Sequence, residues 1–173
     1  VPKMIKKTAE EYPEVIAQYK RVKGADFQPI LYREMFQLGL DFGAALLNLG
    51  VKREQPIGLI SDNRAEWQHA DLGIMAIGAV DVPRGCDATL IDLEKILSIT
   101  ETEIVIAENN SQVNKIVTLK EKLPAVKTII YFEPDLKDEV IGAAKAADIE
   151  LLYFMDVLKE GQIWRVENKG VVE

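Results

Sequence analysis

Apolar side chains recur every three or four positions in the longest regular segment of the chain, from Arg33 to Leu49. The positions that would share one face of a helix are Met35, Leu38, Phe42, Leu46 and Leu49. Gly50 follows at the position where a residue in the left-handed conformation commonly closes a helix. The pattern therefore predicts an amphipathic helix over residues 33–49.

Short apolar runs alternate with amphipathic runs through the rest of the chain. The apolar runs predict strands at residues 56–60, 79–82, 104–107, 128–131 and 149–154, with Pro83 ending the second of them. The runs between them predict helices at residues 64–77, 89–100, 110–122 and 136–147, whereas residues 159–173 show no clear pattern. Strands that alternate with helices indicate an α/β fold, with a mostly parallel sheet covered by helices on both faces.

The N-terminal residues follow a different pattern. Residues 3–11 read as a helix that stops at Tyr12-Pro13, because a residue before proline avoids the helical region. Residues 14–23 and 27–31 then read as two strands on either side of a turn signal, Gly24-Ala25-Asp26. We expect an antiparallel hairpin at the entrance to the domain.

Polar residues at the starts of the predicted helices have the order expected of helix caps. The predicted pairs are Asn63 with Glu66 and Thr89 with Asp92, and Asn110 or Ser111 would cap the helix at residues 110–122. On the helix at residues 64–77 we expect a core face of Trp67, Ala70, Ile74 and Ile77. His69 lies off that face and has no Ser or Cys nucleophile beside it in sequence, so a partly exposed structural residue is favoured over a catalytic base.

Composition narrows the class of protein. A chain of 173 residues that is 48% hydrophobic suits one globular domain with a real core. A net charge of −7 argues against a nucleic-acid-binding surface. The single cysteine, Cys86, cannot form an internal disulfide, so a reducing, cytoplasmic setting is expected. The longest stretch without a charged residue, Phe42 to Val51, is too short to span a bilayer, and the start shows no secretory leader pattern.

Candidate chemistry lies in three polar loops that follow predicted strands. The loops are Ser61 to Arg64, Pro83 to Asp87, and Glu108 to Asn110. In open α/β sheets ligands bind outside the carboxyl ends of the strands, and helix N-termini there can hold phosphate or carboxylate groups. Ordinary capping and turn formation explain the same residues, and both interpretations stay open.

The second loop is the most suggestive, because Thr89 already accounts for capping there. Gly85 would let a ligand approach the backbone, and Arg84 could pair with a phosphate. Cys86 is either an ordinary small loop residue or a thiol activated by the helix N-terminus. The sequence has no G-x-G-x-x-G, no P-loop motif, no nucleophile elbow and no His/Cys metal spacing, so we expect neither a complete catalytic constellation nor a metal site.

Several features between Pro29 and Pro83 occur together in a characteristic order. They are Tyr32 and Glu34, Leu49-Gly50-Val51, Asn63 to Trp67, and Gly78-Ala79-Val80-Asp81-Val82-Pro83. The segment resembles the opening of the AMP-forming (adenylate-forming) acyl-CoA and acyl-carrier-protein synthetases. The continuation VPRGCDAT is most similar to the long-chain branch, and the runs TAEEYPEVIAQ, EIVIAENNSQVNKI and VKTIIYFE extend the resemblance from Thr8 to Leu158.

The resemblance implies a ligase that uses ATP with Mg²⁺ to convert a long-chain fatty acid to an acyl-adenylate. It then transfers the acyl group to the thiol of CoA or an acyl-carrier protein. Residues 1–173 would be the N-terminal α/β portion of the large domain. The family's phosphate loop and C-terminal domain have no counterpart here, so we expect this chain to be inactive alone and to hold none of these cofactors tightly.

The family also suggests where an acceptor could touch this chain. By position, Arg84, Gly85 and Cys86 correspond to a loop that lies near CoA in related synthetases. Some relatives carry arginines for the CoA phosphate where Asn109 to Lys115 stand, and only Lys115 is basic here. CoA contact through that helix is therefore not expected, and the family likeness also allows a homodimer.

Two other functions remain open on the sequence alone. A stand-alone α/β module would use the same three loops to hold a small anion. An interaction protein would instead pair with a separate catalytic chain and expose an apolar patch for docking.

Overall fold

The computed structural model describes residues 1–21, 24 and 26–172. The chain divides into two compact units. The first comprises Val1–Arg53, Asn63–Gly78 and Leu158–Glu173, and the second comprises Glu54–Asp62 and Ala79–Val157.

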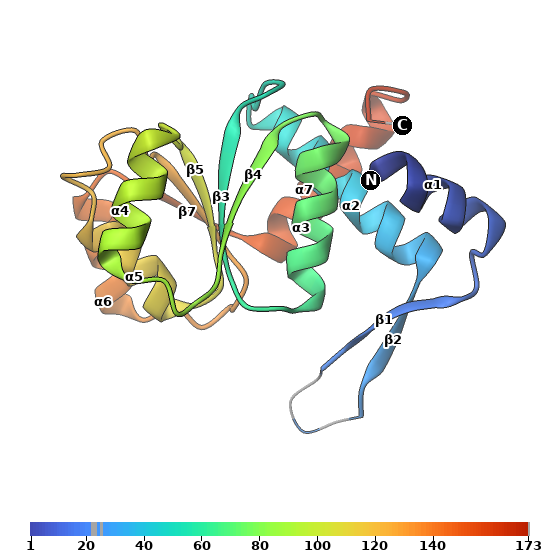
Figure 1. The fold of residues 1–173 in the computed structure, drawn as a ribbon, viewed down its shortest axis with the longest axis horizontal. Helices are drawn as coiled ribbons and strands as arrows, with labels where there is room; N and C mark the ends of the chain where they lie inside the picture. The colour runs from blue at the N-terminus through green and yellow to red at the C-terminus, as the bar shows by residue number, and fades with distance from the viewer. Residues whose placement is uncertain (22–23, 25, 173) are drawn as a thin grey trace. The chain divides into compact units, whose positions relative to one another are not determined.

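The second unit is built on a five-stranded sheet in which all neighbouring strands are parallel. Its strands are β3 (Pro56–Ile60), β4 (Val80–Arg84), β5 (Ile104–Ala107), β6 (Thr128–Tyr131) and β7 (Glu150–Tyr153). Their order is β4-β3-β5-β6-β7 (Figure 1). The chain therefore leaves β3 in one direction to form β4 and returns on the other side to form β5. Such a switch point is where open α/β sheets bind ligands.

Three helices cover one face of this sheet: α4 (Leu90–Ile99), α5 (Asn110–Thr118) and α6 (Asp138–Ala146). Each contributes apolar residues to a shared core, namely Leu93 and Leu97, Val113 and Ile116, and Val140 and Ala144. They pack against alternate strand residues, Ile60, Val105 and Ile129, because successive strand side chains point to opposite faces. The predicted fold class, a parallel sheet flanked by helices with an antiparallel hairpin, is confirmed.

The prediction that Pro83 ends its strand is wrong. β4 runs to Arg84, and in the register of the two strands Pro83 stands opposite Leu59 of β3. The Val80 N–H donates to Gln55 and the Arg84 carbonyl accepts from Ser61, so the backbone of Pro83 faces away from β3. β4 is an edge strand of the sheet, and proline is tolerated there because its missing donor faces away from the ladder.

The first unit begins with α1 (Pro2–Glu11) and an antiparallel hairpin of β1 (Ile16–Lys20) and β2 (Gln28–Leu31). The predicted helix and hairpin are confirmed at these positions. Part of the predicted first strand and of the predicted turn, namely Val22, Lys23 and Ala25, lies outside the described residues.

Two helices, α2 (Tyr32–Asn48) and α3 (Ala65–Ala76), pack closely in the first unit. A side chain on Gly73 would come within 2.8 Å of the Gly39 carbonyl oxygen, so glycine permits this approach. The predicted core residues of α2 at Met35, Phe42 and Leu46 are buried, whereas Leu49 is 38% exposed. Gly50 adopts a φ of +84°, as its closing role predicts.

The sequence pattern missed the helix α7 (Phe154–Glu167). Its first residue, Phe154, was expected to end the preceding strand. The side chain of Phe154 is fully buried and packs edge-on against Phe132, with the two ring centroids 4.8 Å apart. Gly161 lies within the helix, where glycine lowers intrinsic helical propensity. A side chain on Gly161 would clash with the Asp41 carbonyl of α2, so tertiary packing requires the residue that weakens the sequence signal.

The helix caps were predicted with mixed success. Thr89 and Asp92 form the predicted reciprocal cap of α4. The N-cap of α5 is Asn109 rather than Asn110 or Ser111, because its side-chain oxygen accepts hydrogen bonds from the first free N–H groups of the helix, those of Ser111 and Gln112. The N-cap of α3 is Arg64 rather than Asn63, with no side-chain hydrogen bond. Within the described residues no helix is both long and apolar enough to cross a membrane.

Candidate functional site

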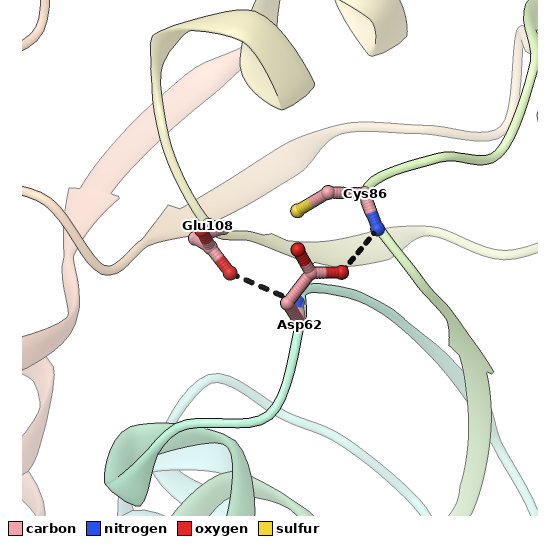
Figure 2. A group of neighbouring side chains, drawn as sticks. All are labelled: Asp62, Cys86 and Glu108. Atoms are coloured by element: carbon pink, nitrogen blue, oxygen red, sulfur yellow. Dashed lines mark hydrogen bonds between the residues drawn. The ribbon is translucent and has the colours of Figure 1, made fainter.

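Three strand ends of the second unit converge at the switch point. Asp62 follows β3, Cys86 follows β4 and Glu108 follows β5, and their side chains approach one another (Figure 2). We call these three residues the strand-end cluster. The convergence follows from topology, because the carboxyl ends of neighbouring parallel strands lie at the same edge of a sheet.

Glu108 joins the ends of β5 and β3. Its Oε2 atom accepts a hydrogen bond of 2.7 Å from the Ser61 hydroxyl and one of 2.9 Å from the Asp62 N–H. The Ser61 hydroxyl also donates to the Asp62 carbonyl oxygen at 2.9 Å. Hydrogen bonds to an ionised carboxylate are among the stronger ones in proteins, so this carboxylate fixes the exit of β3.

The loop after β4, which we call the β4–α4 loop (Gly85 to Thr89), is held from two sides. The Cys86 N–H donates to Asp62 Oδ1 at 2.9 Å. From α5, the Lys115 ammonium donates to the carbonyl oxygens of Cys86 at 2.9 Å and Ala88 at 2.8 Å. The one basic residue of this helix is therefore engaged with the loop backbone.

The environment of Cys86 argues against an activated thiol. Burial raises the pKa of the Cys86 thiol to about 11, and the negative charge of Glu108 acts in the same direction. Both causes disfavour the thiolate, which is the nucleophilic form. Of the two interpretations left open by the sequence, burial and the charge of Glu108 favour the ordinary loop residue over the activated thiol.

Arg84 and Gly85 line a groove of about 440 Å³ beside α4, together with Lys95 and Ile99. Arg84 is exposed, and its Nη1 atom donates to the Pro83 carbonyl oxygen at 2.8 Å. A side chain on Gly85 would meet only the Asp87 carboxylate within 3 Å, and that group can move. The structure thus brings two of the three predicted site residues to one groove, while the third lies in the strand-end cluster.

The strand-end cluster does not fit Mg²⁺, the ion that the resemblance implies. Its ligand atoms lie within 4.8 Å of one another, but one of them is the Cys86 sulfur. Mg²⁺ demands oxygen ligands in octahedral geometry, and burial disfavours the thiolate of Cys86 by raising its pKa. Asp62 and Glu108 also each use one carboxylate oxygen to accept a backbone N–H.

A second polar cluster, in the first unit, was not foreseen from sequence. His69 was expected to be partly exposed but is only 4% exposed, because α3 is buried on most sides. Its Nε2 atom lies 2.8 Å from Nε2 of Gln18 on β1, and burial lowers its pKa to about 4. No local sequence signal points to this contact, since the partners are far apart in the chain.

Glu66 lies in the same cluster rather than in the predicted capping role. Lys20 Nζ approaches its carboxylate at 2.6 Å and Arg64 Nε at 2.9 Å. Burial alone would raise the pKa of Glu66, but hydrogen bonds from Arg64 and Lys20 hold it at about 2. The cluster ties the hairpin to α3 and presents no nucleophile, so we assign it a structural role.

The fold recurs in adenylate-forming domains. The adenylation domain of a carboxylate reductase from Mycobacterium chelonae superposes with a TM-score of 0.82 at 18% identity, covering 93% of this chain and 29% of that one. The anthranilate CoA ligase AuaEII, solved with anthranoyl-AMP, gives 0.77 at 18% identity, covering 92% and 27%. At this identity the likeness concerns the fold alone.

The family follows from the sequence match. The model of the AMP-binding enzyme family matches residues 5–163, and this chain belongs to that family. The family predicted from the sequence is confirmed.

Two curated relatives align with most of this chain. A chloroplastic long-chain-fatty-acid–[acyl-carrier-protein] ligase of Arabidopsis thaliana is 33% identical over 116 residues, which cover 67% of this chain and 16% of that protein. The long-chain-fatty-acid–CoA ligase ACSBG2 of Xenopus laevis is 23% identical over 139 residues, covering 80% and 19%. The chain thus spans less than a fifth of the length of each.

Proposed function

We propose that this chain is the N-terminal α/β portion of a ligase that joins long-chain fatty acids to CoA or to an acyl-carrier protein. The observation that carries the proposal is the family match over residues 5–163, combined with relatives that are named for both acceptors. The small share of those relatives that the chain spans fits a part of a larger enzyme.

In the parent enzyme, ATP and a fatty acid form an acyl-adenylate and release pyrophosphate, and the acyl group then passes to a pantetheine thiol. Mg²⁺ accompanies the ATP and supplies charge neutralisation at its phosphates. Arg84 and Gly85 contact the acceptor from their groove, and Cys86 holds the loop through its backbone N–H. The chain alone makes no adenylate, and the parent is cytoplasmic and able to form a homodimer.

A pyrophosphate-exchange assay with ATP and palmitate tests the division of labour. The parent polypeptide should exchange labelled pyrophosphate into ATP, and this chain alone should not. Exchange by this chain at a rate comparable to the parent would overturn the view that its activity depends on residues outside it.

The acceptor contact is tested separately in the parent enzyme. Arg84→Gln should raise the KM for the acceptor about tenfold while pyrophosphate exchange continues, because a lost contact to a charged group costs about 1.5 kcal/mol. Gly85→Ala should also raise that KM, because its methyl group keeps the acceptor away from the backbone. Lys127→Gln removes an exposed pair with Glu103 and serves as the matched surface control. Equal KM values in all three variants would remove these two residues from the acceptor site.

The size of the native polypeptide decides between this function and a stand-alone module. An antibody raised against this chain should detect a band several times larger than 19.4 kDa in the source cells. A band at 19.4 kDa would contradict the ligase proposal.

A further inference from the structure

One lysine of α5 holds the β4–α4 loop in the second unit. The Lys115 ammonium donates to the carbonyl oxygens of Cys86 and Ala88, at 2.9 and 2.8 Å. The described residues give this ammonium no carboxylate within ion-pair distance, so the loop backbone is its partner. The positive charge of Lys115 therefore acts on the conformation of the loop rather than on a surface ion pair.

The backbone of the loop turns sharply where Lys115 contacts it. The Ala88 N–H donates to the Gly85 carbonyl oxygen at 3.2 Å, which is the hydrogen bond of a four-residue turn. Because a trans peptide unit is planar, the C=O of Cys86 and the N–H of Asp87 point in opposite directions. The hydrogen bond from Lys115 to Cys86 therefore turns the Asp87 N–H away from α5.

The Asp87 N–H belongs to a loop that borders the groove beside α4. The lining of that groove includes three loop residues and two cations, namely Gly85, Asp87, Ala88, Arg84 and Lys95. Within the part of the chain that the structure describes, the Asp87 N–H has no hydrogen-bond partner. The loop thus offers a backbone donor next to the residues assigned to the acyl acceptor.

We propose that Lys115 is a positioning residue for the acyl acceptor. Its ammonium keeps the β4–α4 loop in the conformation in which Gly85 and the Asp87 N–H meet the phosphopantetheine arm of the acceptor. CoA and an acyl-carrier protein share this arm, and its amide and phosphate oxygens accept hydrogen bonds. A loop that is already held in its binding conformation loses less entropy when the acceptor binds.

The inference rests on the proposed function and adds a residue that acts through the loop without touching the acyl acceptor. A matched control exists in Lys120, whose ammonium also donates to two backbone carbonyl oxygens, those of Pro124 and Val126. These residues precede β6, so they lie at the end of the sheet opposite the candidate site. Lys115→Met and Lys120→Met thus remove equivalent hydrogen bonds, and only the first should affect the β4–α4 loop.

Amide hydrogen exchange in this chain measures the positioning directly. Lys115→Met should speed the exchange of the Cys86 and Ala88 N–H groups about threefold or more, because the loop opens more often. Lys120→Met should leave both exchange rates as they are in the wild type. Unchanged exchange in Lys115→Met would overturn the proposal, whatever the parent enzyme does.

Steady-state kinetics of the parent enzyme test the consequence for the acyl acceptor. Lys115→Met should raise the KM for the acceptor about fivefold while the rate of pyrophosphate exchange stays the same, and Lys120→Met should change neither. Asp62→Ala removes the carboxylate that accepts the Cys86 N–H on the other side of the loop. It should raise the same KM, so the test does not depend on one variant.

Arg84→Gln separates a failure of this inference from a failure of the proposed function. If Arg84→Gln raises the KM for the acyl acceptor and Lys115→Met does not, the positioning role is overturned and the acceptor site remains. If neither variant raises that KM, the acceptor site itself is contradicted and the positioning role falls with it.

Discussion

The hydroxyl of Ser61, directly after β3, donates a 2.7 Å hydrogen bond to the carboxylate of Glu108, directly after β5. The two residues are 47 positions apart in the chain. Their contact spans the switch point of the sheet, where the backbone turns away in opposite directions. The bond therefore fixes the spacing of the two loops between which this class of sheet binds its ligands.

Removal of the Glu108 carboxylate should loosen this edge. Glu108→Ala leaves the Ser61 hydroxyl and the Asp62 N–H without their shared acceptor, which should lower the free energy of unfolding by about 1–3 kcal/mol. Urea denaturation measures the change. Glu103→Ala, which removes only an exposed pair with Lys127, should cost less than about 0.5 kcal/mol. Equal losses in the two variants would contradict the linking role of Glu108.

Asn109 should stabilise α5 more than any other asparagine of that helix. Its Oδ1 atom accepts from the N–H groups of Ser111 and Gln112 at 3.0 and 3.3 Å. Asn109→Ala should therefore cost about 1 kcal/mol in thermal or urea unfolding. Asn114→Ala, at an exposed position of the same helix, should be neutral or slightly stabilising because alanine has the higher helical propensity. The reverse order of stabilities would show that Asn109 is not the cap.

The buried imidazole of His69 should make the protein less stable in mild acid. Its pKa is lowered from 6.5 to about 4 in the folded state, so the unfolded state binds the proton more readily. The stability due to neutral His69 is complete above pH 6.5 and falls by roughly 3 kcal/mol as the pH drops to about 4. Glu66, held at a pKa of about 2, adds a further loss only below pH 4.5.

NMR can follow His69 directly, because it is the only histidine of the chain. Its ring signals should titrate with a midpoint near pH 4 while the protein stays folded. In His69→Gln, the slope of unfolding free energy between pH 6.5 and 4.5 should be smaller than in the wild type. A midpoint near 6.5 would mean that the imidazole is exposed to solvent.

Two helical glycines should respond in opposite ways to alanine. Gly161→Ala would push a methyl group into the Asp41 carbonyl and against Ala45 of α2, and should destabilise the protein by at least about 2 kcal/mol. Gly142→Ala in α6 meets nothing within 4 Å and should stabilise it by about 0.5–1 kcal/mol. Thermal denaturation compares them, and a harmless Gly161→Ala would show that α7 does not need this close approach.

The three loops of the candidate site could be located from sequence because each follows a short apolar strand. Strand ends are marked locally, by the change from β-branched residues to Asp, Asn, Gly and Arg. The connections between the loops could not be derived in this way. Glu108 accepts from Ser61, Asp62 accepts from Cys86, and Lys115 holds the β4–α4 loop, and each contact joins segments that only the sheet order brings together.

Several errors of the sequence interpretation have one physical origin. Pro83 belongs to a strand because that strand lies at an edge of the sheet, and His69 is buried on α3, where its ring contacts Gln18 of the distant strand β1. Gly161 belongs to a helix because α2 lies within contact distance. In each case a tertiary neighbour overrides the local preference of the residue.

The sequence by itself determined the α/β class, the number and approximate positions of the strands, the hairpin and the family, because hydrophobic periodicity and motif order are local properties of the chain. The tertiary structure alone decided the sheet order, the raised pKa of the Cys86 thiol and the burial of His69. These properties depend on which distant side chains exclude water or bring charge near a residue, and a linear pattern does not encode that proximity.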